Sequence, residues 1–250
     1  MLTQGDLIAV AVADGHGTSA HGDIGAEVAV EIAVHALIRF AVDLGPRQSD
    51  VASSYAEHPL RVQLAREWVD RIRERVGAEN ANLRPYGTTL IFALAAPTFL
   101  LIGQIGDGDI LLIDGSGRVS HPIAPDPASF AEETASLCQG EAWSSMRVLA
   151  IPPPEHETLL LLSTDGYSKS YATDEVFERI GPDYLDMVRE SGLEAVETQL
   201  HAILSAVTTG GSGDDIAMNM LYWPEAGTPV NNAGQLEGSS ETGRDPCASS

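Results

Sequence analysis

Four turns rich in Asp and Gly hold the side chains of this sequence that could do chemistry. They are VADGHG with Asp14, QIGDGD with Asp107 and Asp109, LSTDGY with Asp165, and GSGDDI with Asp214 and Asp215. A single Asp-Gly pair more often forms an ordinary turn, since both residues tolerate turn conformations. Several such turns on rigid strand ends could instead supply the oxygen ligands that hard cations such as Mg²⁺ and Mn²⁺ prefer.

A histidine belongs to the first of these turns. His16 lies two residues after Asp14, between two glycines. An imidazole can titrate near neutral pH and could therefore donate a proton in a reaction. The structural alternative is a turn residue whose ring points into solvent.

The composition is that of a globular protein with a strongly acidic balance. The chain has 250 residues, of which 44% are hydrophobic, and its 36 acidic and 14 basic residues give a net charge of -22. Nucleic acids and anionic membranes are bound by clustered Lys and Arg, so the balance argues against both as partners. It is compatible with divalent cations, although a solvated acidic surface is the commoner cause of acidity.

Cysteine usage and the N-terminal sequence indicate a soluble cytoplasmic protein. Cys138 and Cys247 are far apart and form no CxxC pair, as expected in a reducing compartment. No basic and apolar signal peptide opens the chain, and the longest apolar runs are strand-sized. Arg greatly outnumbers Lys, with Lys169 the sole lysine, and Ala is abundant; both features hint at a GC-rich bacterial genome.

Apolar periodicity predicts the order of helices and strands. Helices are expected at 24–40, 59–76, 173–180, 182–190 and 193–207. Strands are expected at 7–13, within 88–96 and 99–119 as one antiparallel meander, twice within 146–166, and at 214–223. These elements do not alternate regularly, which favours an α+β layered domain over a parallel sheet. We assign 1–223 to one domain and 224–250 to a disordered tail, because the tail is too polar to bury a core.

The ordered set of motifs resembles the protein phosphatase 2C family of metal-dependent Ser/Thr protein phosphatases. The resemblance covers about residues 7 to 222 and rests on DGHG, on YGTTLIFAL with IGDGD, on LLLLSTDG and on GSGDDIAMNML. The form GDGD, in place of the more widespread GDSR, looks like a compact bacterial branch of the family. The resemblance implies a four-layer αββα sandwich of two antiparallel sheets flanked by helix pairs.

The resemblance also implies a role for individual residues. Asp14 would bridge two Mn²⁺ or Mg²⁺ ions, the Gly15 carbonyl would bind the second ion, Asp165 and Asp214 would complete the ligands of the first, and Asp107 would hold a weak third. Such ions lower the pKa of a water molecule and neutralise phosphoryl oxygens, so that hydroxide attacks in line without a covalent intermediate. His16 would protonate the leaving Ser or Thr oxygen. The implied substrates are phosphorylated proteins, and the implied counterpart is a Ser/Thr kinase in bacterial signalling.

Two departures from the family pattern affect the metal sites. Only MLTQGD precedes the first expected strand, so the N-terminal strand, with its phosphate-binding Arg and a later acidic pair for the second metal, is expected to be missing. Asp6 is the sole acidic residue there and receives no role. Lys169 replaces an acidic residue that would support the third ion.

Two other functions are compatible with parts of the sequence. A subtilisin-like reading of HGTSAHG fails because too few residues precede it to supply the catalytic Asp. A non-catalytic regulatory or binding module on the same fold stays open, since the missing N-terminal strand motivates it. The retained Asp14, Asp165, Asp214 and His16 argue against it.

Overall fold

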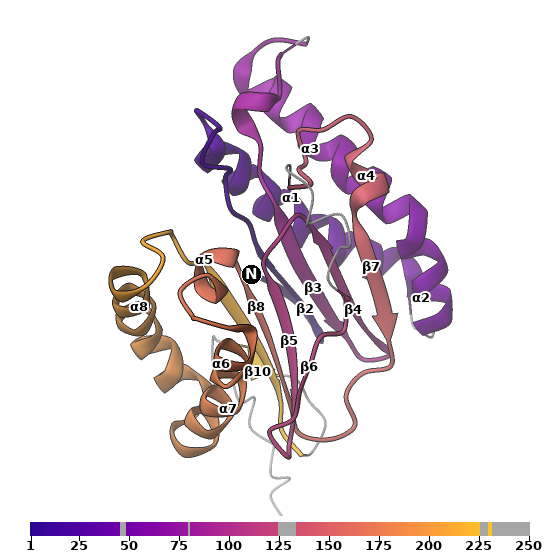
Figure 1. The fold of residues 1–250 in the computed structure, drawn as a ribbon. Helices are drawn as coiled ribbons and strands as arrows, with labels where there is room; N and C mark the ends of the chain where they lie inside the picture. Colours follow the sequence, from indigo (N-terminus) through magenta and orange to yellow (C-terminus); the bar gives the residue numbers. More distant parts are fainter. Residues whose placement is uncertain (46–48, 80, 125–133, 226–229, 232–250) are drawn as a thin grey trace, which may run out of the picture.

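Two five-stranded antiparallel sheets face each other, and helices cover their outer sides (Figure 1). The structure is a computed structural model and describes residues 1–45, 49–79, 81–124, 134–225 and 230–231. The first sheet has the order β1 (Leu2–Gln4), β2 (Leu7–Val12), β3 (Leu90–Ala96), β4 (Phe99–Ile105) and β7 (Arg147–Ile151). The second has the order β10 (Val230–Asn231), β9 (Met218–Trp223), β8 (Thr158–Ser163), β5 (Asp109–Asp114) and β6 (Val119–Ser120).

Each sheet has its own helical cover. The first is covered by α1 (Gly22–Leu44), α2 (Ser49–Tyr55), the π-helical turn η1 (Ala56–Leu60) and α3 (Arg61–Val76). The second is covered by α6 (Asp174–Glu178), α7 (Ile180–Ser191) and α8 (Leu193–Gly210). Three short helical turns complete the described elements: η2 (Arg84–Tyr86), α4 (Ala142–Ser145) and α5 (Asp165–Ser168). The predicted α+β sandwich of two antiparallel sheets is confirmed.

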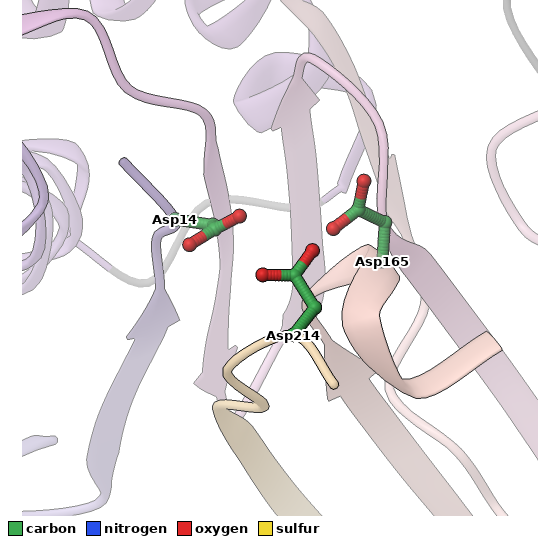
Figure 2. A group of neighbouring side chains, drawn as sticks. All are labelled: Asp14, Asp165 and Asp214. Carbon is green, nitrogen blue, oxygen red and sulfur yellow. The ribbon is translucent and has the colours of Figure 1, made fainter. Parts of the chain in front are cut away.

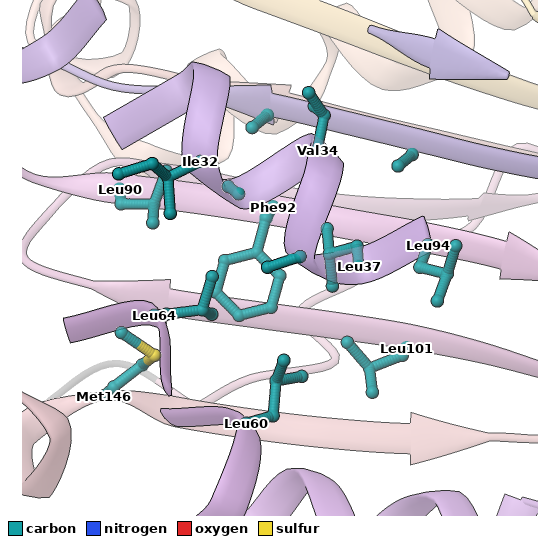
Figure 3. Close-up of a cluster of buried hydrophobic side chains, with 14 of the residues drawn as sticks. Ile32, Val34, Leu37, Leu60, Leu64, Leu90, Phe92, Leu94, Leu101 and Met146 are labelled. Atoms are coloured by element: carbon teal, nitrogen blue, oxygen red, sulfur yellow. The ribbon is translucent and has the colours of Figure 1, made fainter. Parts of the chain in front are cut away.

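The apolar run of β3 shows why a continuous hydrophobic strand fits the middle of this sandwich. Leu90, Phe92 and Leu94 pack with the helices on the outer side, as Figure 3 shows around α1. Ile91 and Ala93 belong instead to the cluster between the two sheets. Successive side chains of a strand point to opposite faces, so a strand buried on both faces needs apolar residues throughout.

The expectation of one meander through 99–119 was wrong. Strand β4 pairs with β3 and β7 in the first sheet, whereas β5 pairs with β8 and β6 in the second. The chain changes sheets at 106–108, where Gly108 adopts a φ of +103°. A Cβ at Gly108 would also lie 2.8 Å from the carbonyl oxygen of Ser163. Glycine at position 108 therefore allows the chain to pass tightly from the first sheet to the second.

The termini of the domain also differ from expectation. The short strand β1 precedes the first predicted strand and pairs with β2, so strand structure does occur before residue 7. Within the predicted disordered tail, Val230–Asn231 pairs with β9, while 226–229 and 232–250 lie outside the described residues. The helix expected from residue 59 begins earlier, because α2 continues through η1 into α3. No helix in the described ranges has the length and apolar character that crossing a membrane requires.

Gly25 allows α1 to pack against the η2 segment, and its substitution tests that contact. A Cβ at this position would lie 2.0 Å from the Tyr86 carbonyl oxygen. Gly-to-Ala in a helix normally stabilises by about 1 kcal/mol. Here we expect Gly25→Ala to lower the free energy of unfolding by roughly 1–3 kcal/mol, the usual cost of overpacking, as measured by urea denaturation. Gly210→Ala in α8 is the control, because among the described residues no atom beyond its chain neighbours and its own helix backbone lies within 4 Å of the added Cβ. Equal or greater stability of Gly25→Ala would contradict the packing.

Candidate active site

Three carboxylates from separate strand ends meet at one end of the sandwich. Asp14 follows β2, Asp165 follows β8 at the start of α5, and Asp214 lies shortly before β9. Each contributes a carboxylate oxygen to a group whose members all lie within 4.8 Å of one another. Figure 2 shows the three side chains facing a shared space. The predicted convergence of these residues is confirmed.

The backbone of Asp14 is fixed by the two threonines of the YGTT motif. The Asp14 amide donates to Thr89 Oγ1 at 3.1 Å, and the Asp14 carbonyl accepts from the Thr89 amide at 2.9 Å. Thr88 Oγ1 also donates to that carbonyl at 2.8 Å. Both threonines are buried. The backbone of Asp14, two residues after β2, is therefore held in place by the two residues that precede β3.

Asp214 is held next to Asp165 by a close approach of two backbones. A Cβ on Gly166 would lie 2.6 Å from the Asp215 carbonyl oxygen and 3.2 Å from Asp214 Cβ. The position after Asp165 therefore requires glycine, since a larger residue would push the segment before β9 away. Thr164 adds a second connection, because its amide donates to the Ala217 carbonyl at 3.0 Å.

The cluster is short of positive charge. Burial, followed by the charges of Asp165 and Asp214, raises the pKa of Asp14 from 3.8 to about 6. Lys169, one helical turn after Asp165, donates a hydrogen bond to Asp165 Oδ2 and forms an ion pair with it. That interaction raises the pKa of Lys169. The lysine is exposed over 56% of its side chain and offsets part of the repulsion among the carboxylates.

The chemistry of the donor set fits a divalent cation. Asp165 is only 9% exposed, yet its Oδ1 accepts no hydrogen bond from any residue that the structure describes. A buried carboxylate oxygen normally has a partner, since leaving one without a partner is costly. A cation shared with Asp14 and Asp214 would satisfy this oxygen and remove the repulsion.

The other predicted site residues lie around this cluster. Gly15 forms a single antiparallel bridge with Thr88. The His16 amide donates to the Gly87 carbonyl at 3.0 Å, and its half-buried side chain lines a groove beside the cluster. Asp107 Oδ2 accepts from Thr134 Oγ1 at 3.3 Å, and burial, then the charge of Asp165, raises the Asp107 pKa.

Sequence reasoning missed two contributions to the site. The sequence motif gave Thr88 and Thr89 no separate role. A threonine hydroxyl near the start of a strand can nevertheless form hydrogen bonds with the backbone of an adjacent turn. Lys169 was read only as a lost acidic residue. Its spacing of four from Asp165, within a short helical turn, was a usable signal for an ion pair.

Comparison with known proteins assigns the family. A sequence model described as "Protein phosphatase 2C" matches residues 1–205, which is most of the chain. The chain belongs to the protein phosphatase 2C family. Its match to this phosphatase 2C model includes Asp14, Asp107 and Asp165, but it ends before Asp214, which the structure alone brings to the cluster.

One curated relative and several solved structures resemble this phosphatase 2C chain. It is 29% identical over 170 residues to Serine/threonine-protein phosphatase 3 of Escherichia coli (strain K12), covering 66% of this chain and 61% of the relative. The catalytic domain of the phosphatase PstP, in complex with two manganese ions, has a TM-score of 0.51 at 18% identity, over 90% of this chain and 88% of that one. PppA, a regulatory component of T6SS in Pseudomonas aeruginosa, has a TM-score of 0.53 at 20% identity, over 86% and 85% of the two chains. The structural matches show a shared fold.

The raised carboxyl pKa values predict how pH affects the stability of the metal-free protein. Asp14 and Asp109 both have a pKa raised from 3.8 to about 6, chiefly by burial. The folded protein therefore binds these protons more tightly than the unfolded chain does, and their contribution to stability is lost as the pH rises from about 4 to about 6. In EDTA, urea denaturation should show that Asp14→Asn gains stability relative to the wild type over this range.

Manganese provides the control for this pH prediction. A bound cation favours the ionised carboxylate, so saturating Mn²⁺ should abolish the advantage of Asp14→Asn at pH 7. A difference between variant and wild type that stays constant from pH 4 to pH 7 in EDTA would contradict the raised pKa of Asp14.

Proposed function

We propose that this protein hydrolyses phosphoserine and phosphothreonine in proteins with the help of divalent metal ions. The observation that carries the proposal is the meeting of Asp14, Asp165 and Asp214 around a buried carboxylate oxygen without a hydrogen-bond donor in the described structure. Family membership supports the same reaction, as does the name of the E. coli relative. The chain spans 61% of that relative's length, and the activity is inferred for this chain from its own residues.

The residues of the cluster have distinct proposed roles. Asp14, Asp165 and Asp214 would hold a first ion, and Asp14 together with the Gly15 carbonyl would hold a second. Bound ions of this kind supply Lewis-acid activation of water and neutralise the charge of the phosphoryl oxygens. PstP, of the same fold, carries two manganese ions, which supports Mn²⁺ as a candidate beside Mg²⁺. A third ion at Asp107 would compete with Lys169 for the carboxylate of Asp165.

His16 is the proposed proton donor for the leaving group. The residue follows Asp14 on the same turn, and its ring lies beside the Gly87 backbone, since a Cβ at Gly87 would be 2.9 Å from His16 Cδ2. This contact and the bond from the His16 amide hold the residue against Gly87, two positions along the chain from Asp14. An imidazole can protonate a Ser or Thr oxygen as its bond to phosphorus breaks.

The cellular setting is proposed on the composition and on family membership. The two separate cysteines support a cytoplasmic protein, and family membership supports a bacterial signalling role that reverses the action of a Ser/Thr kinase. The acidic balance argues against nucleic acid and membrane as partners, whereas phosphorylated proteins are proposed as partners on family membership.

Removing the metal, or one ligand, should abolish turnover. Asp165→Asn replaces a charged ligand with a neutral amide, so we expect a loss of more than roughly 100-fold in kcat on a phosphothreonine peptide, beyond the usual effect of an outer-shell residue. EDTA should abolish the wild-type activity and excess Mn²⁺ should restore it. Calorimetric Mn²⁺ titration should show weaker binding to Asp165→Asn, whereas the exposed control Asp43→Asn should bind like the wild type. Full activity in EDTA would overturn the proposal.

His16→Ala should separate substrates by their leaving groups. On phosphopeptides, whose alkoxide leaving group needs a proton, kcat should fall by roughly 10²–10⁴-fold, the usual size of general-acid catalysis. On an activated aryl phosphate the loss should be much smaller, because the phenolate departs without full protonation. Mn²⁺ affinity, measured by calorimetry, should be retained. Equal losses on both substrates would exclude His16 from the role of acid.

A further inference from the structure

An open groove of about 810 Å³ runs beside the carboxylate cluster. Three segments form its walls: 16–20 after the DGHG turn, 82–85 before β3, and 134–140 before α4. Hydrogen bonds hold the walls together. Ser19 Oγ donates to the Arg84 carbonyl at 3.1 Å, and the Leu137 amide donates to the Thr88 carbonyl at 3.0 Å. The groove is therefore part of the folded domain and not a gap between loose loops.

The groove adjoins the cluster at two points. His16 lines it and follows Asp14 by two residues. Thr134 also lines it and donates to Asp107 at 3.3 Å. A peptide whose phosphoryl group lies at the cluster could thus place its neighbouring residues in the groove.

The described lining of the groove has no acidic side chain, although the protein as a whole is strongly acidic. The chain carries a net charge of -22, yet none of the described residues that line the groove is Asp or Glu. Hydroxyl and amide groups line it instead, on Thr18, Ser19, Asn82, Ser136 and Gln139. Arg84 is the one arginine or lysine among these lining residues. An acidic surface repels anionic substrates, and the described lining of this groove adds no carboxylate to that repulsion.

Arg84 differs from several exposed arginines in having no ion-pair partner among the described residues, a property that it shares with Arg66 and Arg179. Arg39, Arg71, Arg75 and Arg189 each form ion pairs with carboxylates. Arg84 is exposed, and no ion pair within the described residues includes it. Its guanidinium can therefore accept a new carboxylate partner without breaking an existing ion pair.

We propose that this groove binds the peptide segment around the phosphorylated residue of the substrate, and that Arg84 pairs with an acidic side chain of that segment. The inference rests on the proposed phosphatase function and adds a substrate class to it: phosphoproteins with Asp or Glu next to the phosphorylated residue. Arg84 acts on substrate choice, while the carboxylate cluster acts on the phosphoryl group.

The test compares three substrates: an acidic phosphothreonine peptide, the same peptide with its Asp and Glu replaced by Asn and Gln, and an aryl phosphate. For Arg84→Gln we expect kcat/KM on the acidic peptide to fall roughly tenfold, mainly through KM, as for the loss of one charge-assisted hydrogen-bonded pair. The losses on the other two substrates should be several times smaller. Arg84→Lys should recover part of the preference, and added salt should reduce it in the wild type.

Arg66→Gln is the matched control, because Arg66 is an exposed arginine of α3 that does not line the groove. It should retain the wild-type preference for the acidic peptide. Equal losses of Arg84→Gln on all three substrates, or an equal effect of Arg66→Gln, would overturn the inference.

Binding separates this inference from the proposed function. Fluorescence anisotropy of the labelled acidic phosphopeptide should show weaker binding to Arg84→Gln than to the wild type or Arg66→Gln. If the wild type hydrolyses none of the three substrates but shows this difference, the proposed function fails and the groove assignment stands. Turnover without any preference for the acidic peptide leaves the function standing and overturns the role of Arg84.

Discussion

Repulsion among Asp14, Asp165 and Asp214 is the constraint on which the rest of this structure depends. Three carboxylates within 4.8 Å of one another would move apart if their supports allowed it. The supports are backbone contacts, which do not depend on the charge of the side chains. Repulsion can then be relieved in only three ways: protonation, as the raised pKa of Asp14 indicates, a neighbouring ammonium group, or a bound cation. The three carboxylates are therefore already in position to bind a cation in the metal-free protein.

The sandwich explains why those supports are rigid. The carboxylates lie at strand ends of both sheets, and the sheets are joined by an apolar layer that includes Val12, Ile91 and Leu162. Moving Asp14 away from Asp165 would require sliding one sheet over the other and opening this layer. Burial of each large apolar side chain contributes about 1.5–3 kcal/mol, so the layer as a whole outweighs the repulsion of partly screened charges. The hydrophobic core thus fixes the geometry of the polar site.

The sequence predicted the parts of this protein that depend on local patterns. Asp-Gly after an apolar run identified the ends of β2 and β8, and the order of motifs implied which residues meet. The crossing between sheets at 106–108 was not predictable. The sequence of a turn with Gly108 is compatible both with a hairpin, in which β5 would pair with β4, and with a passage of β5 into the other sheet. The family pattern marks Lys169 only as the replacement of an acidic residue. Its bond to Asp165 follows instead from the spacing of four residues between the two side chains. The groove around Arg84 could not be predicted, since its walls come from three distant segments.

Lys169 shares the carboxylate of Asp165 with any cation that would bind at the cluster. Its ammonium group occupies Oδ2 of Asp165, while Oδ1 is left for another positive charge. An ion that uses Oδ1 together with Asp14 and Asp214 can bind while the lysine stays. An ion between Asp107 and Asp165 would meet the field of the ammonium and would need it to move into solvent, where more than half of the side chain already lies. The same lysine that pairs with Asp165 would therefore oppose a cation at Asp107 more than a cation at Asp14, Asp165 and Asp214.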